Sequence, residues 1–142
     1  MNGGPDVSSF TGPLTLTELD SNWREWRLEQ DLIYDIGAEN SGRRIVVPAG
    51  FVTDGASIPR IFWGLFPAWG KYSRASVVHD YLCSAIVMGV PEKEAPTAHQ
   101  ADAVFLEAMA VSGVDPISRY VMYAACRVAA ILRFRQTSRI AP

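Results

Sequence analysis

The stretch Phe51-Val-Thr-Asp-Gly-Ala-Ser-Ile-Pro-Arg60 separates a part of the chain that is typical of strands from a part that is typical of helices. Within it, Asp54 and Ser57 suit a turn or a helix N-cap, because their side-chain oxygens bond to nearby backbone N–H groups. We therefore expect this stretch to be a turn that sets the first helix against a preceding sheet.

Before this stretch, the sequence predicts a small antiparallel sheet. Between Trp23 and Ile36, aromatic and β-branched residues alternate in part with polar ones, until Gln30 breaks the pattern. Such alternation is typical of a strand with one buried face. Residues 37–42 (Gly-Ala-Glu-Asn-Ser-Gly) predict a hairpin loop, and residues 43–48 predict the returning strand.

After this stretch, the sequence predicts three helices. The first covers about residues 74–88, with Ser73 as its N-cap, and the second covers about residues 98–112, with Thr97 as its N-cap. The third begins at residue 115 or 116 and ends near residue 134. Along the third helix, apolar residues recur at helical spacing, and we expect this stripe to pack on the core: Ile117, Tyr120, Val121, Ala124, Val128, Ile131 and Leu132.

The fold class that we predict is α+β, with a small N-terminal antiparallel sheet followed by three helices. The chain has 142 residues, of which 49% are hydrophobic and 20% charged, which fits one domain with a single core. Residues 14–135 are expected to form this domain. Residues 1–13 predict an arm that is flexible or held by a partner, and residues 136–142 predict a C-terminal tail.

The charges are distributed unevenly along the chain. The net charge of −2 gives no bias toward nucleic acid, and the acidic N-terminal part argues against a nucleic-acid-binding role. After Asp115 the only charged residues are five arginines. They fit a solvated helix end, but they could also meet phosphates, an anionic membrane or an acidic partner.

Several features bear on the compartment. The first residues lack the basic and apolar regions of a signal peptide, and no apolar run reaches the ~18 residues of a membrane span. Cys83 and Cys126 are far apart in the sequence and have no metal-ligand spacing, so we expect free, buried thiols in a reducing compartment.

The segment Val77-Val-His-Asp-Tyr-Leu82, together with Asp102, carries the most suggestive side chains. If the first two helices are antiparallel neighbours, Asp102 comes close to His79, and a carboxylate bonded to one ring nitrogen fixes the tautomer of the ring. We therefore predict a site with His79 and Asp102 as the catalytic groups. Asp80 and Asp54 are the candidate metal ligands, and the residues expected to shape the site or bind substrate are Ser57, Arg60 and Tyr81.

Other interpretations of these residues remain open. They also fit a buried structural network, in which Arg60 would neutralise Asp102 or Asp80. A Ser57-His79-Asp102 triad is possible on residue types but lacks a nucleophile-elbow pattern. His99 and Asp102 have the i, i+3 spacing of metal ligands, although His99 is expected at the exposed start of its helix.

Three motifs give the chain a resemblance to a known family. They are Val47-Pro-Ala-Gly-Phe-Val-Thr-Asp-Gly-Ala-Ser-Ile-Pro-Arg60, His79-Asp80-Tyr81-Leu82 and Ala101-Asp102-x-x-Phe105-x-x-x-Met109. The sequence from about Trp23 to Phe134 resembles a phage-encoded family of domains of unknown function. The resemblance implies a bacteriophage or prophage origin and supplies no activity.

The His-Asp pair followed by an aromatic, with Asp-x-x-Phe on an antiparallel helix, is also similar to the secreted, calcium-dependent phospholipase A family. This resemblance implies that His79 activates water, that Asp80 binds calcium and that Asp102 orients His79, with Tyr81 as the adjacent aromatic. The loop at Asp54 would stand where that family binds calcium through backbone carbonyls. The family's disulfides and its glycine-rich calcium loop are absent from this sequence.

Two functions follow as expectations. In the first, a phage protein hydrolyses an ester in a lipid or envelope component with the His79/Asp102 site and calcium, either from the virion or at lysis. In the second, the chain is a non-catalytic structural or assembly protein of the head or tail that contacts other virion proteins. Either would be found in the virion or the host cytoplasm.

Overall fold

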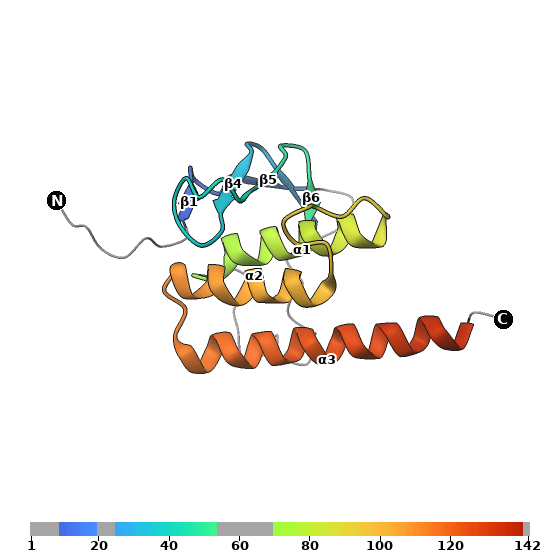
Figure 1. Cartoon of the computed structure of the whole chain (residues 1–142). Helices are drawn as coiled ribbons and strands as arrows, with labels where there is room; N and C mark the ends of the chain where they lie inside the picture. The colour runs from blue at the N-terminus through green and yellow to red at the C-terminus, as the bar shows by residue number, and fades with distance from the viewer. Residues whose placement is uncertain (1–8, 20–24, 54–69, 141–142) are drawn as a thin grey trace.

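The computed structural model describes residues 9–19, 25–53 and 70–140. Within these ranges, strands precede helices along the chain, as Figure 1 shows. The predicted α+β fold, with strands first and three helices after them, is confirmed. The strands are β1 (Ser9–Thr11), β2 (Leu16–Glu18), β3 (Trp26–Leu28), β4 (Leu32–Asp35), β5 (Arg44–Val47) and β6 (Val52–Thr53), and the helices are α1 (Ser73–Val87), α2 (Ala98–Val111) and α3 (Pro116–Ile140).

The described strands form two small antiparallel sheets rather than the single sheet that we expected, with the strand orders β1-β4-β5 and β2-β3-β6. The chain passes from the second sheet to the first between Leu28 and Leu32, where Gln30 breaks the alternation of the sequence. The predicted hairpin is confirmed, because β4 and β5 pair in register from Leu32↔Val47 to Asp35↔Arg44.

Structured residues lie on both sides of the limits expected for the domain, residues 14–135. Ser9–Thr11 of the expected N-terminal arm form β1, in which Phe10 pairs with Tyr34 of β4 and their ring centroids are 4.7 Å apart. At the other end, α3 continues to Ile140, so residues 136–140 of the expected tail are helical.

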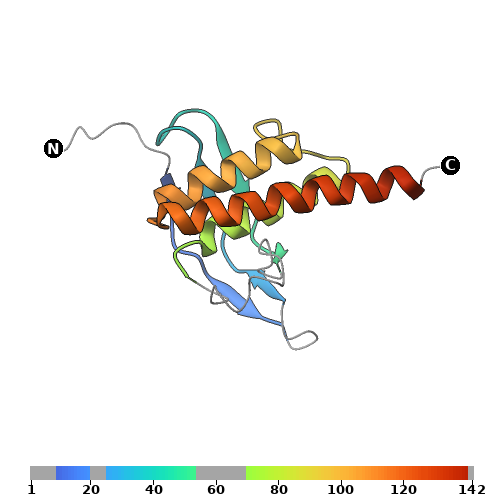
Figure 2. The same ribbon diagram turned by 90° about the horizontal axis from the view of Figure 1, so that it is seen from below.

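The three described helices stack in layers beneath the sheets, as Figures 1 and 2 show from two directions. α1 packs between the strands and α2, and α3 packs on α2. The helices alternate in direction, as expected for α1 and α2. Thr97 is the N-cap of α2, as predicted, whereas Tyr72 and not Ser73 occupies that position in α1.

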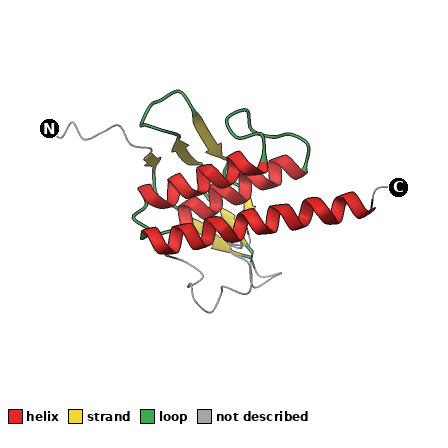
Figure 3. Ribbon diagram, turned by 60° about the horizontal axis from the view of Figure 1, so that its bottom comes forward, coloured by secondary structure: helices red, strands yellow, loops and turns green. Residues whose placement is uncertain are grey.

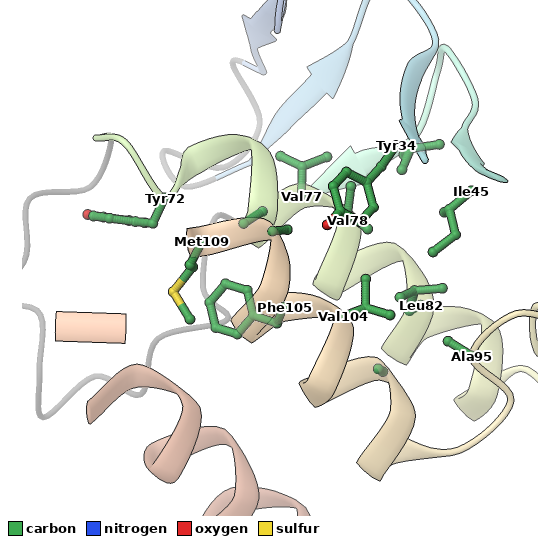
Figure 4. Packing of buried hydrophobic residues seen from close by; sticks show 14 of the residues in the cluster. Tyr34, Ile45, Tyr72, Val77, Val78, Leu82, Ala95, Val104, Phe105 and Met109 are labelled. Atoms are coloured by element: carbon green, nitrogen blue, oxygen red, sulfur yellow. The ribbon is translucent and has the colours of Figure 1, made fainter. Parts of the chain in front are cut away.

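The core lies where the strands, α1 and α2 meet, and Figure 4 shows its main contacts. In β5 buried side chains alternate with exposed ones, whereas in β4 all but Ile33 are buried. Tyr34 and Ile45 point toward α1. α1 contributes Val78 and Leu82, which are separated by one helical turn. Burying each large apolar side chain of this kind contributes roughly 1.5–3 kcal/mol, so these layers are held mainly by apolar packing.

The prediction that the apolar stripe of the third helix packs on the core was wrong. All seven of its residues are exposed. The residues of α3 that are buried, Met122 and Cys126, lie on the opposite side of the helix, toward α2. Helical spacing identified a face of the helix correctly, but it could not identify which face the neighbouring helix covers. Among the described helices, none combines the length and the apolar character needed to cross a bilayer.

Candidate functional site: a buried cluster of His79, Asp102 and Arg127

Three polar side chains from three helices meet in the interior. α1 supplies His79, α2 supplies Asp102 and α3 supplies Arg127. His79 Nε2 lies 2.6 Å from Asp102 Oδ1, and Arg127 Nη1 donates a hydrogen bond of 2.8 Å to Asp102 Oδ2. The expected proximity of His79 and Asp102 is therefore confirmed, while their catalytic roles stay a prediction.

The cluster is enclosed by protein. The side chains of His79 and Asp102 are 8% and 3% exposed, and that of Arg127 is 25% exposed. Phe105, nearly one turn after Asp102, stacks on the His79 ring with 4.7 Å between the centroids. Charges that leave water are costly unless they are paired and hydrogen-bonded. Here one carboxylate uses both of its oxygens to pair with groups on two neighbouring helices.

The surroundings determine the protonation of His79. Burial lowers the pKa of this ring, but the hydrogen bond with Asp102 and the contact with Cys83 outweigh burial and raise the pKa to about 9. At neutral pH the ring is therefore an imidazolium whose Nε2–H donates to Asp102. An imidazolium has no lone pair with which to accept a proton from water, so His79 becomes a base only at alkaline pH.

Two thiols that the sequence did not single out for this site lie beside the cluster. Cys83 follows His79 by four residues, and its Sγ lies 3.5 Å from His79 Nε2. Cys126 Sγ lies within 4.8 Å of ligand atoms of both His79 and Asp102. Neither thiol is part of a disulfide. The i, i+4 spacing of His79 and Cys83 could have revealed the first contact.

His79, Asp102 and Cys126 are the described residues whose grouping could hold a metal ion. An imidazole, a carboxylate and a thiolate suit zinc, whereas calcium takes about six to eight oxygen ligands. A metal ion bound here would take the place of the proton that lies between His79 and Asp102. Since Asp102 is already paired with His79 and Arg127, the cluster is satisfied without an ion.

The other predicted residues are placed differently. Tyr81 is not part of the cluster: its hydroxyl donates to Glu92 Oε1 at 2.5 Å, and its ring lies perpendicular to that of Phe51. Burial and the contact with Glu92 raise the pKa of Tyr81 to about 12. Asp80 is half-buried and points about 100° away from its neighbour His79, because both are in α1.

Asp54, Ser57 and Arg60 lie outside the described residues, so their expected roles stay predictions. The cation that pairs with Asp102 in the described part of the chain is Arg127, which the sequence did not single out. His99 is exposed at the start of α2, as expected.

The fold and the cluster together define an α+β domain in which a buried His–Asp–Arg group joins three helices. Residues 26–126 match the family described as "Protein of unknown function (DUF1353)", and the chain belongs to this family. The match runs from β3 into the first half of α3 and ends one residue before Arg127. The sequence resemblance to a family of unknown function is thus confirmed, without its phage origin.

One curated relative matches over about two thirds of this chain. "Uncharacterized protein y4jT" of Sinorhizobium fredii (strain NBRC 101917 / NGR234) is 35% identical over 100 residues, which cover 69% of this chain and 26% of that protein. The match thus spans about a quarter of the relative's length. No solved structure matches the chain.

Proposed function

We propose that this chain is a non-catalytic structural or assembly protein of a bacteriophage particle, in which the cluster of His79, Asp102 and Arg127 fixes the packing of the helices. The observation that carries the proposal is the enclosure of His79 and Asp102, whose side chains are 8% and 3% exposed. A catalytic dyad has to reach water and a substrate. The phage setting rests on the sequence motifs at Phe51–Arg60 and His79–Leu82.

The cluster has a direct structural use. Asp102 on α2 connects α1 through His79 and α3 through Arg127. Other registers of the three helices would leave at least one of these charges without its partner. Breaking a buried pair costs about 3–5 kcal/mol, so the cluster selects one arrangement of helices over similar apolar packings.

The two histidines of the chain provide a matched pair for the test. His79→Ala and His99→Ala would each be assayed for stability by urea denaturation and for calcium-dependent release of fatty acid from phospholipid vesicles. The proposal expects no release by any form, and a loss of stability in His79→Ala alone. Release by the wild type and by His99→Ala, but not by a folded His79→Gln variant, would contradict it.

The phage setting needs its own test. Antibodies against the chain would be used on particles purified from the phage or induced prophage that encodes it. The proposal expects the chain in the purified particles, or in assembly intermediates that precede them. Detection only in the lysate, outside particles and intermediates, would contradict a structural or assembly role.

One observation favours a second function, the hydrolysis of a lipid or envelope ester. The 2.6 Å contact puts a carboxylate on one nitrogen of His79, which is how a histidine base is oriented. In this second proposal Asp80 and Asp54 hold calcium. Because the hydrogen bond with Asp102 raises the pKa of His79, release of fatty acid should increase as the pH rises and the ring loses its proton. Release that is independent of pH and of calcium would exclude this second function.

A further inference from the structure

The bulky apolar face of α3 is exposed in the part of the chain that the structure describes. Its large side chains keep between 37% and 79% of their surface in contact with solvent. Figures 1 to 3 show that α3 also extends beyond the end of α2, so none of the described helices lies alongside its last turns. Contiguous apolar surface of this kind marks an interaction site in soluble proteins. We name it the α3 seam: Ile117, Tyr120, Val121, Ala124, Val128, Ile131 and Leu132.

The spacing of the seam specifies the shape of its partner. Ile117, Val121, Ala124, Val128 and Ile131 follow one another at intervals of four, three, four and three residues. This is the a/d pattern of a coiled coil, in which apolar side chains insert between those of a second helix. The pattern covers ~21 Å of helix at 1.5 Å per residue. A second helix is therefore the occupant whose geometry fits the seam.

The charge of the segment specifies the chemistry of that helix. From Pro116 to the end of the chain, all five charged residues are arginines. Of these, Arg127 is committed to Asp102, and Arg119 donates to Val114 O. Helical spacing puts Arg135 and Arg139 on the same face of α3 as the seam, beyond Ile131. A cationic helix end of this kind attracts an acidic helix.

Two other occupants fit less well. A second copy lying parallel would place the arginines of one α3 against those of the other, with no acidic residue after Asp115 on either helix to offset the repulsion. A membrane-surface helix typically carries Trp, Phe or Leu on a wide apolar face. The five a/d positions hold β-branched Ile and Val with one Ala, which suit close packing between helices.

We propose that the α3 seam binds an amphipathic helix of another protein, with apolar residues at heptad spacing and acidic residues beside them. This inference rests on the proposed assembly role, because it names the kind of partner such a role requires. The seam from Val128 onward lies outside residues 26–126, which match the family. Residues outside the family match would therefore contribute to the recognition of the partner.

The test uses two synthetic peptides of several heptads, each with Ile at a and Leu at d. One peptide has Glu at e and g and the other has Lys, so that each repels copies of itself. Binding to the full chain would be measured by fluorescence anisotropy. We expect the Glu peptide to bind at least about tenfold more tightly than the Lys peptide, since each ~1.4 kcal/mol is a factor of ten. High salt should reduce this difference.

Seam variants locate the binding surface. Val121→Glu combined with Val128→Glu should weaken binding of the Glu peptide by at least about a hundredfold, because two charges enter a buried seam. Val87→Glu, at an exposed valine of α1, is the matched control and should bind like the wild type. Val121→Ser with Val128→Ser provides a neutral pair, which should also weaken binding while circular dichroism shows an intact fold.

Each remaining outcome would overturn the inference. These are equal binding of both peptides, binding that survives in the seam variants, a wild-type dimer in sedimentation that Val121→Glu dissociates, and seam-dependent sedimentation with phosphatidylglycerol vesicles. Failure of the peptide test would leave the assembly role intact, because another surface could serve it. Fatty-acid release that depends on His79 would instead overturn the assembly role, whatever the peptides do.

Discussion

Asp102 is the residue on which the interior cluster depends. Its carboxylate is 3% exposed and pairs with both His79 and Arg127. It also connects the two helices on either side of α2, which are α1 and α3. Loss of its charge would therefore affect two cationic groups at once.

Asp102→Asn keeps the shape of the side chain and removes its charge. The imidazolium of His79 and the guanidinium of Arg127 would then share a neutral partner inside the protein. We expect the free energy of unfolding at pH 7 to fall by about 3–5 kcal/mol, as measured by urea denaturation. The control is Asp31→Asn, at an exposed residue that accepts one bond from Ala49 N, and it should cost no more than ~1.5 kcal/mol. Equal losses in the two variants would contradict a special role for Asp102.

The raised pKa of His79 predicts a dependence of stability on pH. The pKa is about 9 in the folded protein and 6.5 for an ordinary histidine. The folded state therefore holds the proton more tightly, so the stabilisation is complete below pH 6.5 and is lost as the pH rises through 9. At ~1.4 kcal/mol per pKa unit the loss is roughly 3 kcal/mol. Urea denaturation between these pH values, with EDTA present, would measure it.

His79→Gln is the control for this effect, since glutamine does not titrate. Its stability should change much less than that of the wild type over the same range of pH. A parallel fall in both proteins would assign the effect to another group.

At the level of elements, the start of α2 shows how local sequence defines a helix. Thr97 accepts a hydrogen bond from Gln100 N, and the Gln100 side chain accepts one from Thr97 N. This reciprocal capping box satisfies backbone N–H groups that a helix start leaves open. It also fixes where α2 begins, and hence the position of Asp102 one turn later.

Thr97→Ala removes the hydroxyl that accepts the hydrogen bond from Gln100 N. We expect a loss of about 1 kcal/mol in the free energy of unfolding, measured by thermal or chemical denaturation. Thr97→Ser keeps the hydroxyl and should retain most of the stability. If the serine variant were as unstable as the alanine variant, the cap would not be the cause.

The sequence predicted the positions of the helices and of the hairpin better than it predicted which face of a helix is buried. Turn residues and caps are local signals, and they gave the β4–β5 hairpin and all three helices within a few residues, except at the C-terminal end of α3. The face of α3 was assigned wrongly, because the apolar stripe from Ile117 to Leu132 is longer and more continuous than the buried pair Met122 and Cys126. That error also hid Cys126 and Arg127, since turning the stripe inward would have turned Cys126 outward. His79 and Asp102 were predicted correctly as neighbours because their helices are joined by a short connection.

At the scale of the whole molecule, Glu107 joins layers that α1 separates. Its Oε1 accepts bonds from the Tyr34 hydroxyl at 2.7 Å and from Gly37 N at 3.0 Å, although Glu107 is in α2 and both partners belong to the β4–β5 hairpin. The hairpin, α1 and α2 therefore share polar contacts as well as a core. We expect them to unfold as one cooperative unit.

A double-mutant cycle tests this connection. Tyr34→Phe should lower the free energy of unfolding by about 1 kcal/mol, because one hydrogen bond is lost. In a Glu107→Ala background the same substitution should cost much less, since the partner is already absent. Chemical denaturation would measure all four proteins. Additive losses would show that the contact does not couple the layers.

The short strand β1 has a consequence for how the domain can be handled. It covers one side of β4 and comes from outside the family region, residues 26–126. A chain that began at Leu14 would leave the backbone N–H and C=O groups of β4 open along a sheet edge, and open edges recruit strands from other molecules. We expect this shortened chain to self-associate with rising concentration, as seen by light scattering, while the full chain does not. By covering the edge of β4, β1 would then protect the domain from aggregation.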